Sequence, residues 1–491
     1  MQFISQKWLV FIAAGIMVLL GNLDMTIVNL ALPPIAKWAG AGLTEAQWLI
    51  VGYLLTTVIF FSIGGRVADL IGKRRVYLFG IALFGLTSLL AGLAPNMLVL
   101  IGARLLQGIG YAATLGLSFL IIVQTFPAEQ RGFASGLTST LVGLSQAAGP
   151  MVGGIILHFF SWRWVFLMNV PLCAISLYMC LAYVPPDELV SHKESLDYKG
   201  LSYFAAGLGI LLVSLNEMAG LSLLMLIILL AVSALFLWLF VHHSLKIKCP
   251  LIDVNLLTHR GYVTILVVRL FFMFSMIGLL FIIPLYLQNI LGLNSLYAGL
   301  LMLCMTALVA VASFITGKIL DKKGFKGPIF ASMIIAAISC LMMHFLQPQL
   351  NIMLLVVSLL CFGIATGIHI PATIDGALKQ ASAKNHGAAI GLFFTIAMLG
   401  GSMGVAISGS IINLHSHTLL TDFLTSHTSA VPANILLQAA NGMYNVFTLP
   451  PQLSLFAQQS FIKALHAVLW LNFGLACLGA LLTLTLPKLK H

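Results

Sequence analysis

Residues 8–32 read WLVFIAAGIMVLLGNLDMTIVNLAL, a long apolar run that contains one acid, Asp24. At about 1.5 Å per helical residue, this run is long enough to cross a bilayer core of about 30 Å. A carboxylate at that depth costs at least about 2.5 kcal/mol on insertion scales, so it indicates an ion or substrate pathway. We expect Asn22, Thr26 and Asn29 to hydrate or hydrogen-bond it. The alternative is an acid tied to a neighbouring helix for packing alone.

The whole chain has the same character. Its 491 residues are 60% hydrophobic and only 8% charged, and the mean hydropathy is +1.07. Soluble proteins carry about 25% charged residues, so we predict a polytopic membrane protein. The apolar runs are continuous, which excludes a β-barrel and predicts helices that satisfy their own backbone groups in lipid. Fourteen spans are expected, at residues 8–32, 46–66, 76–94, 97–124, 133–157, 164–183, 200–218, 221–243, 262–288, 297–317, 328–346, 351–376, 387–413 and 464–487.

The net charge of +11 does not indicate nucleic-acid binding. If the N-terminus is cytoplasmic, most of the 24 lysines and arginines fall in cytoplasmic loops, as the positive-inside rule requires. Both termini are therefore expected in the cytoplasm, and contact with anionic lipids is secondary. The seven cysteines have no metal-ligand spacing and are interpreted as packing residues.

A loop pattern occurs twice. Gly65-x-x-x-Asp69-x-x-Gly72 returns as Gly317-x-x-x-Asp321-x-x-Gly324, 252 residues later. Duplication of a six-helix unit is typical of transporters whose halves rock about a central site. The expected organisation is an N-terminal six-helix bundle (1–183), a cytoplasmic linker (184–199), two inserted helices (200–243), a second cytoplasmic linker (244–261), and a C-terminal six-helix bundle (262–491) with an external loop (414–462).

Four motifs resemble those of the fourteen-span multidrug:proton antiporters of the major facilitator superfamily. They are LDMTIVNLALP (23–33), GGRVADLIGKRR (64–75), RLLQGIGYAA (104–113) and SQAAGPMVGG (145–154). WRWVFLMNVP (162–171) is also typical of that branch. The resemblance implies an all-α membrane protein with the major facilitator fold: two six-helix bundles plus two additional transmembrane helices. An enzyme is not expected, because the chain has no His-Glu-x-x-His or Gly-x-Ser-x-Gly motif.

The resemblance also implies residue roles. The arginine corresponding to Arg104 takes part in proton coupling, and Gln107 follows it in the same motif. A structural arginine that snorkels or pairs with a loop carbonyl is the alternative. The loop implies a cytoplasmic latch between the bundles in the outward-open state; its expected residues are Gly65, Asp69, Gly72, Arg74 and Asp321. Its glycines permit tight turns and close helix approach, and Asp69 can face a helix N-terminus. The loop could instead be a topology signal alone.

The fourth motif combines a proline with small residues, Gly149, Pro150, Gly153 and Gly154. The proline bends the helix, while small residues four apart let helices pack closely. The resemblance implies a proton-tight contact between the bundles and export rather than uptake. Gly400, Gly401 and Gly404 are expected to be the partner in the second half.

The candidate substrate or proton-relay groups are Asn22, Asn29, Gln107, Glu217, Arg269, His369 and Asp375. Glu217 ends the seventh span and is either an accessory acid or a solvated one. Arg269 either attracts an anionic substrate or snorkels to the surface. His369, with Asp375 nearby, either relays protons or packs as a satisfied histidine. The ninth, tenth, eleventh, thirteenth and fourteenth spans contain no acid, which argues against broad selectivity for dicationic compounds.

The predicted function is proton-driven export of small amphipathic compounds across the bacterial cytoplasmic (inner) membrane. Desolvation favours the neutral form of a buried carboxyl, so Asp24 is expected to gain and lose protons as the bundles rock. Protons are the coupling ion and no cofactor is expected. The expected partners are a small-molecule substrate and membrane lipids; a periplasmic adaptor on the 414–462 loop is an open option, and a monomer is expected to suffice. The alternative function is a dedicated exporter of one endogenous metabolite, such as a siderophore or lipid-like compound.

Overall fold

The computed structural model describes residues 6–187, 197–247, 250–252, 254–349, 351–380, 386–426 and 451–486. These residues form helices and short connections, with no strand among them. Fourteen helical segments are long and apolar enough to cross a membrane. The predicted all-α membrane fold and its number of spans are confirmed.

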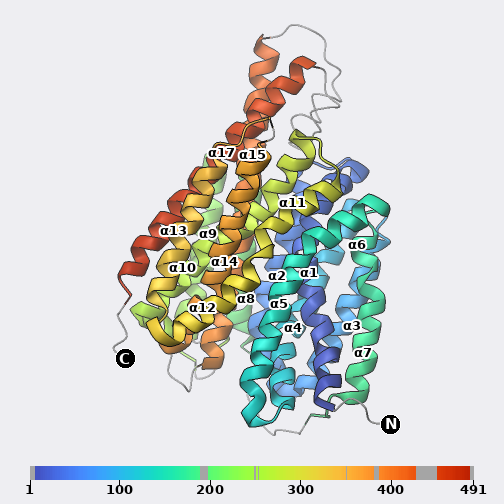
Figure 1. The fold of residues 1–491 in the computed structure, drawn as a ribbon, viewed down its shortest axis with the longest axis vertical. Helices are drawn as coiled ribbons and strands as arrows, with labels where there is room; N and C mark the ends of the chain where they lie inside the picture. Colours follow the sequence, from blue (N-terminus) through green and yellow to red (C-terminus); the bar gives the residue numbers. More distant parts are fainter. Residues whose placement is uncertain are drawn as a thin grey trace.

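The first six spans consist of seven helices, because the sixth span breaks at Met168. The helices are α1 (Gln6–Ala39), α2 (Leu43–Ile71), α3 (Lys73–Gly92), α4 (Met97–Thr125), α5 (Arg131–Phe159), α6 (Trp164–Leu167) and α7 (Asn169–Tyr183). They pack on one another, α1 on α5 and α4, and α3 on α4 (Figure 1). We call α1–α7 the first bundle.

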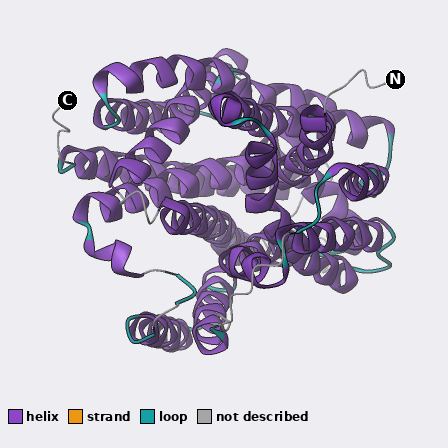
Figure 2. Cartoon of the chain, turned by 90° about the horizontal axis from the view of Figure 1, so that it is seen from below, coloured by secondary structure: helices purple, strands orange, loops and turns teal. Residues whose placement is uncertain are grey.

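The remaining spans form the inserted pair and a second bundle, α10–α17. The inserted helices are α8 (Tyr198–Asn216) and α9 (Leu223–Ser244). The second bundle contains α10 (Arg260–Leu285), α11 (Ser295–Ala307), α12 (Val309–Lys323), α13 (Lys326–Met343), α14 (Ile352–Gln380), α15 (His386–Ser426) and α17 (Pro451–Leu484). A π-helical turn, Tyr286–Ile290, extends α10. Helix α8 packs on α9 and also touches α2 and α15, so the inserted pair lies beside both bundles. Seen from below, the described chain consists of helices joined by loops (Figure 2).

Helix α1 begins and α17 ends at the same end of the molecule, the lower end in Figure 1. We call this the terminal end and the opposite one the distal end. At the distal end, α15 and α17 project beyond the other helices (Figure 1).

Helices extend into both ends of the expected external segment 414–462. Helix α15 continues to Ser426 and α17 begins at Pro451, while residues 427–450 lie outside the described part of the chain. Low hydropathy marked the end of the span, but the stretch from 410 to 426 contains no glycine or proline to end the helix.

The duplicated loop gives each half the same turn. Gly72 follows α2 with φ +109°, and Gly324 follows α12 with φ +70°. A side chain is strained in that region, so glycine is suited to both positions. Gly65 does not form a turn: it lies inside α2, two helical turns earlier. Asp69 and Asp321 lie in the last turns of α2 and α12, and their side chains are outside the described part.

The acid at the N-terminus of α3 is Asp187, from the connection after α7. Its Oδ1 accepts a hydrogen bond from the backbone N–H of Arg74 at 2.8 Å, and its Oδ2 accepts one from Arg75 at 3.2 Å. The Arg74 Nη2 donates to the carbonyl oxygen of Leu181 at 2.7 Å. Negative charge is favoured at a helix N-terminus, so this contact ties the end of the first bundle to the loop motif.

Replacing this cap should weaken the first bundle. We expect Asp187→Ala to lower the free energy of unfolding by about 1 kcal/mol, because two N–H groups lose their acceptor. Thermal unfolding in detergent measures the effect. Glu129→Gln serves as the control, because Glu129 is an exposed acid away from this cap. An unchanged melting temperature would contradict this role for Asp187.

The bundles meet closely at the distal end. An added Cβ at Gly299 of α11 would lie 2.4 Å from the carbonyl oxygen of Pro150, and one at Gly154 would lie 2.7 Å from that of Ser295. Such distances are too short for any side chain, so both glycines are needed for α5 and α11 to pack. The predicted contact between bundles through the fourth motif therefore involves Gly299.

Hydrogen bonds join the bundles at the same end. Gln47 Nε2 donates to the carbonyl oxygen of Val405 at 2.9 Å, and Gln288 Nε2 donates to that of Leu30 at 3.2 Å. Asn413 Nδ2 donates to the Thr44 hydroxyl at 2.7 Å. These hydrogen bonds and the glycine contacts of α5 and α11 hold the bundles together toward the distal end, so this conformation is closed there.

A larger residue at Gly299 should favour the opposite conformation. Overpacking costs about 1–3 kcal/mol, so Gly299→Val should raise the population that is open at the distal end several-fold. Spin labels at the exposed positions Phe159 and Tyr297 would report a longer distance. The control is Gly102→Val, since an added Cβ at Gly102 meets nothing within 4 Å. The same distance distribution in both variants would refute the expectation.

Candidate functional site

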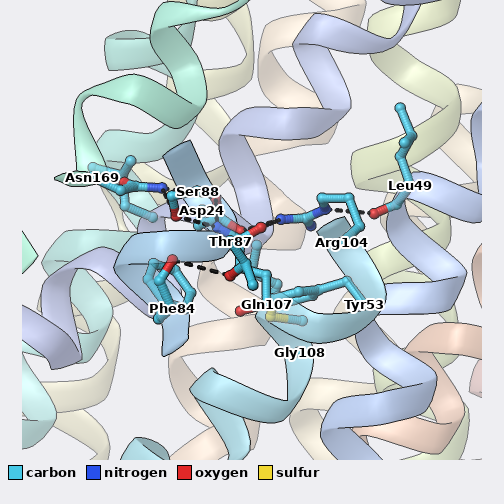
Figure 3. Close-up of polar contacts among 12 residues, drawn as sticks. Asp24, Leu49, Tyr53, Phe84, Thr87, Ser88, Arg104, Gln107, Gly108 and Asn169 are labelled. Carbon is cyan, nitrogen blue, oxygen red and sulfur yellow. Dashed lines mark hydrogen bonds and ion pairs between the residues drawn. The ribbon is translucent and has the colours of Figure 1, made fainter. Parts of the chain in front are cut away.

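Asp24 and Arg104 form an ion pair in the interior of the first bundle. Arg104 Nη1 on α4 lies 2.5 Å from Asp24 Oδ2 on α1 (Figure 3). The residues are 0% and 1% exposed. Each charge is thereby compensated where water and lipid do not reach, as buried charges require.

Polar side chains complete the coordination of the Asp24 carboxylate. Gln107 Nε2 donates to Asp24 Oδ1 at 3.4 Å and to the Ser88 hydroxyl at 2.8 Å. Asn169 Nδ2 donates to the same Asp24 oxygen at 3.3 Å (Figure 3). Residues of α4 and α7 thus bind one acid of α1, and Ser88 of α3 supports them by accepting hydrogen bonds from Gln107 and Asn169.

Arg104 has partners besides the acid. Its Nε donates to the carbonyl oxygen of Leu49 at 2.8 Å, and its Nη1 donates to Gln107 Oε1 at 2.6 Å. The guanidinium lies 4.1 Å from the Tyr53 ring centroid, a cation–π contact. These contacts can hold the guanidinium in place when the carboxyl changes its protonation state.

Several buried polar atoms next to the pair have no hydrogen-bond partner among the described residues. They are Asn169 Oδ1 and the hydroxyls of Tyr53 and Tyr111. The two tyrosine rings stack at 5.8 Å. Gly21 leaves space for Tyr111, because an added Cβ would lie 1.9 Å from its ring. The site therefore retains unused donors and an acceptor near the carboxyl.

The expected neighbours of Asp24 on its own helix do not contact it. Asn22 donates to the carbonyl oxygen of Val18, and Thr26 and Asn29 likewise bond to backbone oxygens one turn earlier. Two residues along a helix turn a side chain by about 200°, so Asn22 and Thr26 lie on the face opposite Asp24.

That opposite face of α1 borders a cavity between the bundles. Asn22 Oδ1 accepts a hydrogen bond from Gln146 Nε2 at 3.1 Å, and Thr26 and Gln146 line the cavity. The other lining residues are Gly143, Met276, Leu280, Met305, Thr306, Val309 and Thr366. Helix α1 thus carries the buried acid on one face and part of the cavity wall on the other.

The small residues of the fourth motif also contact α1. An added Cβ at Gly149 would lie 1.8 Å from the Thr26 hydroxyl oxygen, and one at Gly153 would lie 2.7 Å from Ile27. Gly400 and Gly404 are not their partners across the bundles. They pack against backbone atoms of α10, which is the equivalent position in the second half.

Arg269 and His369 are buried in the second bundle. Arg269 is 4% exposed, does not snorkel to a surface, and lies 5.0 Å from the Phe393 ring centroid. His369 is 0% exposed, stacks on Phe272 at 3.9 Å and bonds through Nδ1 to the Ser332 hydroxyl at 3.0 Å.

Asp375 and Glu217 have partners outside the Asp24 site. Asp375 forms an ion pair of 2.8 Å with Lys379, one turn later on α14. Glu217 Oε1 accepts a hydrogen bond of 3.1 Å from Trp48 Nε1, which ties α8 to α2. Neither residue is brought to the Asp24 site, and Glu217 is not simply solvated.

The sequence analysis did not pair Asp24 with Arg104 or identify Tyr53, Ser88 and Asn169 as their neighbours. One signal was present: charged residues within membrane spans usually pair with one another. Ser88 and Tyr53 carried no such signal, because their spacing matches no motif.

The fold and site can now be compared with known proteins. The sequence profile of the Major Facilitator Superfamily matches residues 14–405. The chain belongs to this superfamily. It is similar to the riboflavin transporter RibZ of Clostridioides difficile (29% identity; 87% of this chain and 92% of RibZ covered) and to the multidrug resistance protein Stp of Mycobacterium tuberculosis (28%; 94% and 88%). Its fold resembles that of a bacterial homologue of the lysosomal transporter Spinster, in an inward-facing conformation, with a TM-score of 0.68, 14% identity and 98% of both chains covered.

These matches make the chain a multi-pass membrane transporter rather than an enzyme. The resemblance to the multidrug transporters of this superfamily, predicted from four motifs, is confirmed by the similarity to the multidrug resistance protein Stp. The structural likeness supports the fold alone.

The buried pair should dominate the stability of the first bundle. Asp24→Asn should lower the free energy of unfolding by about 3 kcal/mol, because Arg104 then keeps an uncompensated charge. Adding Arg104→Gln should recover part of that loss. Thermal unfolding in detergent of both single variants and the double variant measures the coupling. Strictly additive losses would show that the pair contributes no coupling energy.

Proposed function

We propose that this transporter is a proton-coupled exporter of small amphipathic compounds that works by alternating access. The observation that carries the proposal is the fully buried Asp24–Arg104 pair. Its acid lies on the face of α1 opposite the cavity. A titratable acid in the membrane interior is costly, so its presence supports a role in ion coupling.

Protonation of Asp24 would remove the charge that Arg104 compensates. Arg104 keeps the Leu49 carbonyl, Gln107 and the Tyr53 ring as partners, while α1 loses its strongest attachment to α4. Because α1 also lines the cavity through Thr26, its movement would change the substrate site. This is a direct mechanical connection between proton and substrate.

The distal contacts support a direction for the cycle. We place the terminal end in the cytoplasm, as the positive-inside rule indicates. The present conformation, closed at the distal end, would then admit substrate from the cytoplasm. Protons from outside would bind Asp24 in the opposite conformation, in which α5 and α11 have separated. The protein would act as a monomer in the bacterial inner membrane, with an adaptor at the distal ends of α15 and α17 as a further option.

The cavity lining supports an amphipathic substrate. Met276, Met305 and Leu280 provide apolar, adaptable contacts, and Thr306 and Gln146 provide polar ones. Relatives named as multidrug proteins favour a broad substrate range. The relative named as a riboflavin transporter favours the second candidate, a dedicated exporter of one metabolite.

Reconstitution with an imposed pH gradient tests the proposal. Wild-type protein in liposomes should move dyes or antibiotics against their gradient, and Asp24→Asn should reduce that transport at least 100-fold, because its amide cannot carry the proton. Asp24→Glu should retain part of it. Transport of one metabolite alone would favour the dedicated exporter.

Glu129→Gln serves as the matched control, since it removes an exposed acid outside the site. Its transport should equal that of the wild type. Full gradient-driven transport by Asp24→Asn would refute proton coupling through this residue, and equal flux without a gradient would indicate a channel.

A further inference from the structure

We propose that the cavity binds an acidic group of its substrate, a carboxylate or a phosphate, through Arg269. The inference rests on the proposed export function and adds the chemical class of the substrate. It is carried by two buried polar side chains, Arg269 and His369, that have unused hydrogen-bonding atoms. They lie on α10 and α14, two of the helices whose residues line the cavity.

The first observation is the unpaired charge of Arg269. Its Nε and Nη1 are buried with no hydrogen-bond partner among the described residues, and its guanidinium faces the Phe393 ring. Burying an unpaired charge is among the costliest arrangements in a protein. Such a group within the membrane is expected to bind a partner that arrives during function.

No acid whose side chain the structure describes forms an ion pair with Arg269. After residue 244 the chain contains four acids, Asp253, Asp321, Asp375 and Asp422. Only Asp375 has a described side chain, and it pairs with Lys379. The residues that line the cavity are uncharged. The field of Arg269 in this low-dielectric region therefore favours an anion.

The register of α10 places Arg269 on the cavity side. Met276 and Leu280 line the cavity, and they follow Arg269 by seven and eleven residues, which is the spacing of one helix face. Helix α10 starts at the terminal end, so Arg269 lies about 10 Å nearer that end than Met276. A substrate that enters from the terminal end would reach Arg269 before the apolar part of the cavity.

The second observation is His369, one turn after the cavity residue Thr366 on α14. Its Nε2 is buried without a partner in the described structure. The Ser332 hydroxyl donates to the Ile329 carbonyl, so it accepts from His369 Nδ1–H, and Nε2 of the neutral ring is left as an acceptor. His369 stacks on Phe272, which lies one turn after Arg269 on α10, so the imidazole packs on α10 within one turn of Arg269.

Together these groups match an acidic substrate. A guanidinium binds a carboxylate or phosphate through two parallel hydrogen bonds. The neighbouring imidazole nitrogen can accept a hydrogen bond from a hydroxyl or N–H of the same substrate. The apolar remainder of the substrate would lie against Met276 and Leu280.

A matched pair of dyes tests the inference. Rhodamine B carries a carboxylate, and its ethyl ester carries a neutral ester group in that place. Fluorescence polarisation with the purified full-length protein in a neutral detergent measures the binding of each dye without any gradient. Wild-type protein should bind rhodamine B more tightly than the ester.

Arg269→Gln should weaken rhodamine B binding about 10-fold or more and leave the binding of the ester unchanged, since only the carboxylate contact is lost. Arg269→Lys should retain part of the preference, because it keeps the charge but not the two-pronged geometry. The matched control, Arg75→Gln, removes an exposed cation at the terminal end and should change neither affinity. Retained ester binding shows that the variants are folded.

Two results would overturn the inference: no preference of the wild type for rhodamine B, or the same preference in Arg269→Gln. A third arm repeats the assay in the same detergent with added phosphatidylglycerol, and with added phosphatidylcholine as its control. Loss of the preference with the anionic lipid alone would assign the site to a lipid headgroup and refute substrate recognition. Failure of the proposed function is a separate result, namely an intact carboxylate preference without gradient-driven transport in liposomes.

Discussion

The structure depends on one electrostatic constraint: a carboxylate inside a membrane bundle must be compensated. Asp24 meets this requirement through Arg104, with Gln107 and Asn169 completing the contacts. Because Arg104 and Gln107 lie on α4 and Asn169 lies on α7, the pair fixes how these two helices are arranged around α1. Any change in the charge of the acid alters the force that holds this helix.

Close packing transmits that force to the rest of the molecule. Gly149 and Gly153 let α5 lie directly against α1, and Gly154 lets the same helix lie against Gly299 of the second bundle. Helix α5 therefore contacts both the helix that carries the acid and the helix that closes the distal end. A small residue at each of these contacts allows movement without a large side chain in the way.

The two halves share their fold but differ in their charge. Gly72 and Gly324 take the same left-handed turn, and α15 packs on α10 as α5 packs on α1. The first half buries a neutralised pair, whereas the second buries Arg269 with unused donors. A duplicated scaffold with unequal electrostatics can separate two tasks, proton binding in one half and recognition of a substrate in the other.

The sequence by itself determined the fourteen spans, the duplicated loop and the acid within the first span, because hydropathy and spacing are local properties. It did not show that α15 continues past its span to Ser426, since low hydropathy does not end a helix. Only the tertiary structure decided that Asp24 meets Arg104, that Asp187 caps α3 and that no described acid pairs with Arg269. These facts depend on which helix faces turn toward one another. Packing between segments far apart in the chain decides this, and a local sequence pattern does not show it.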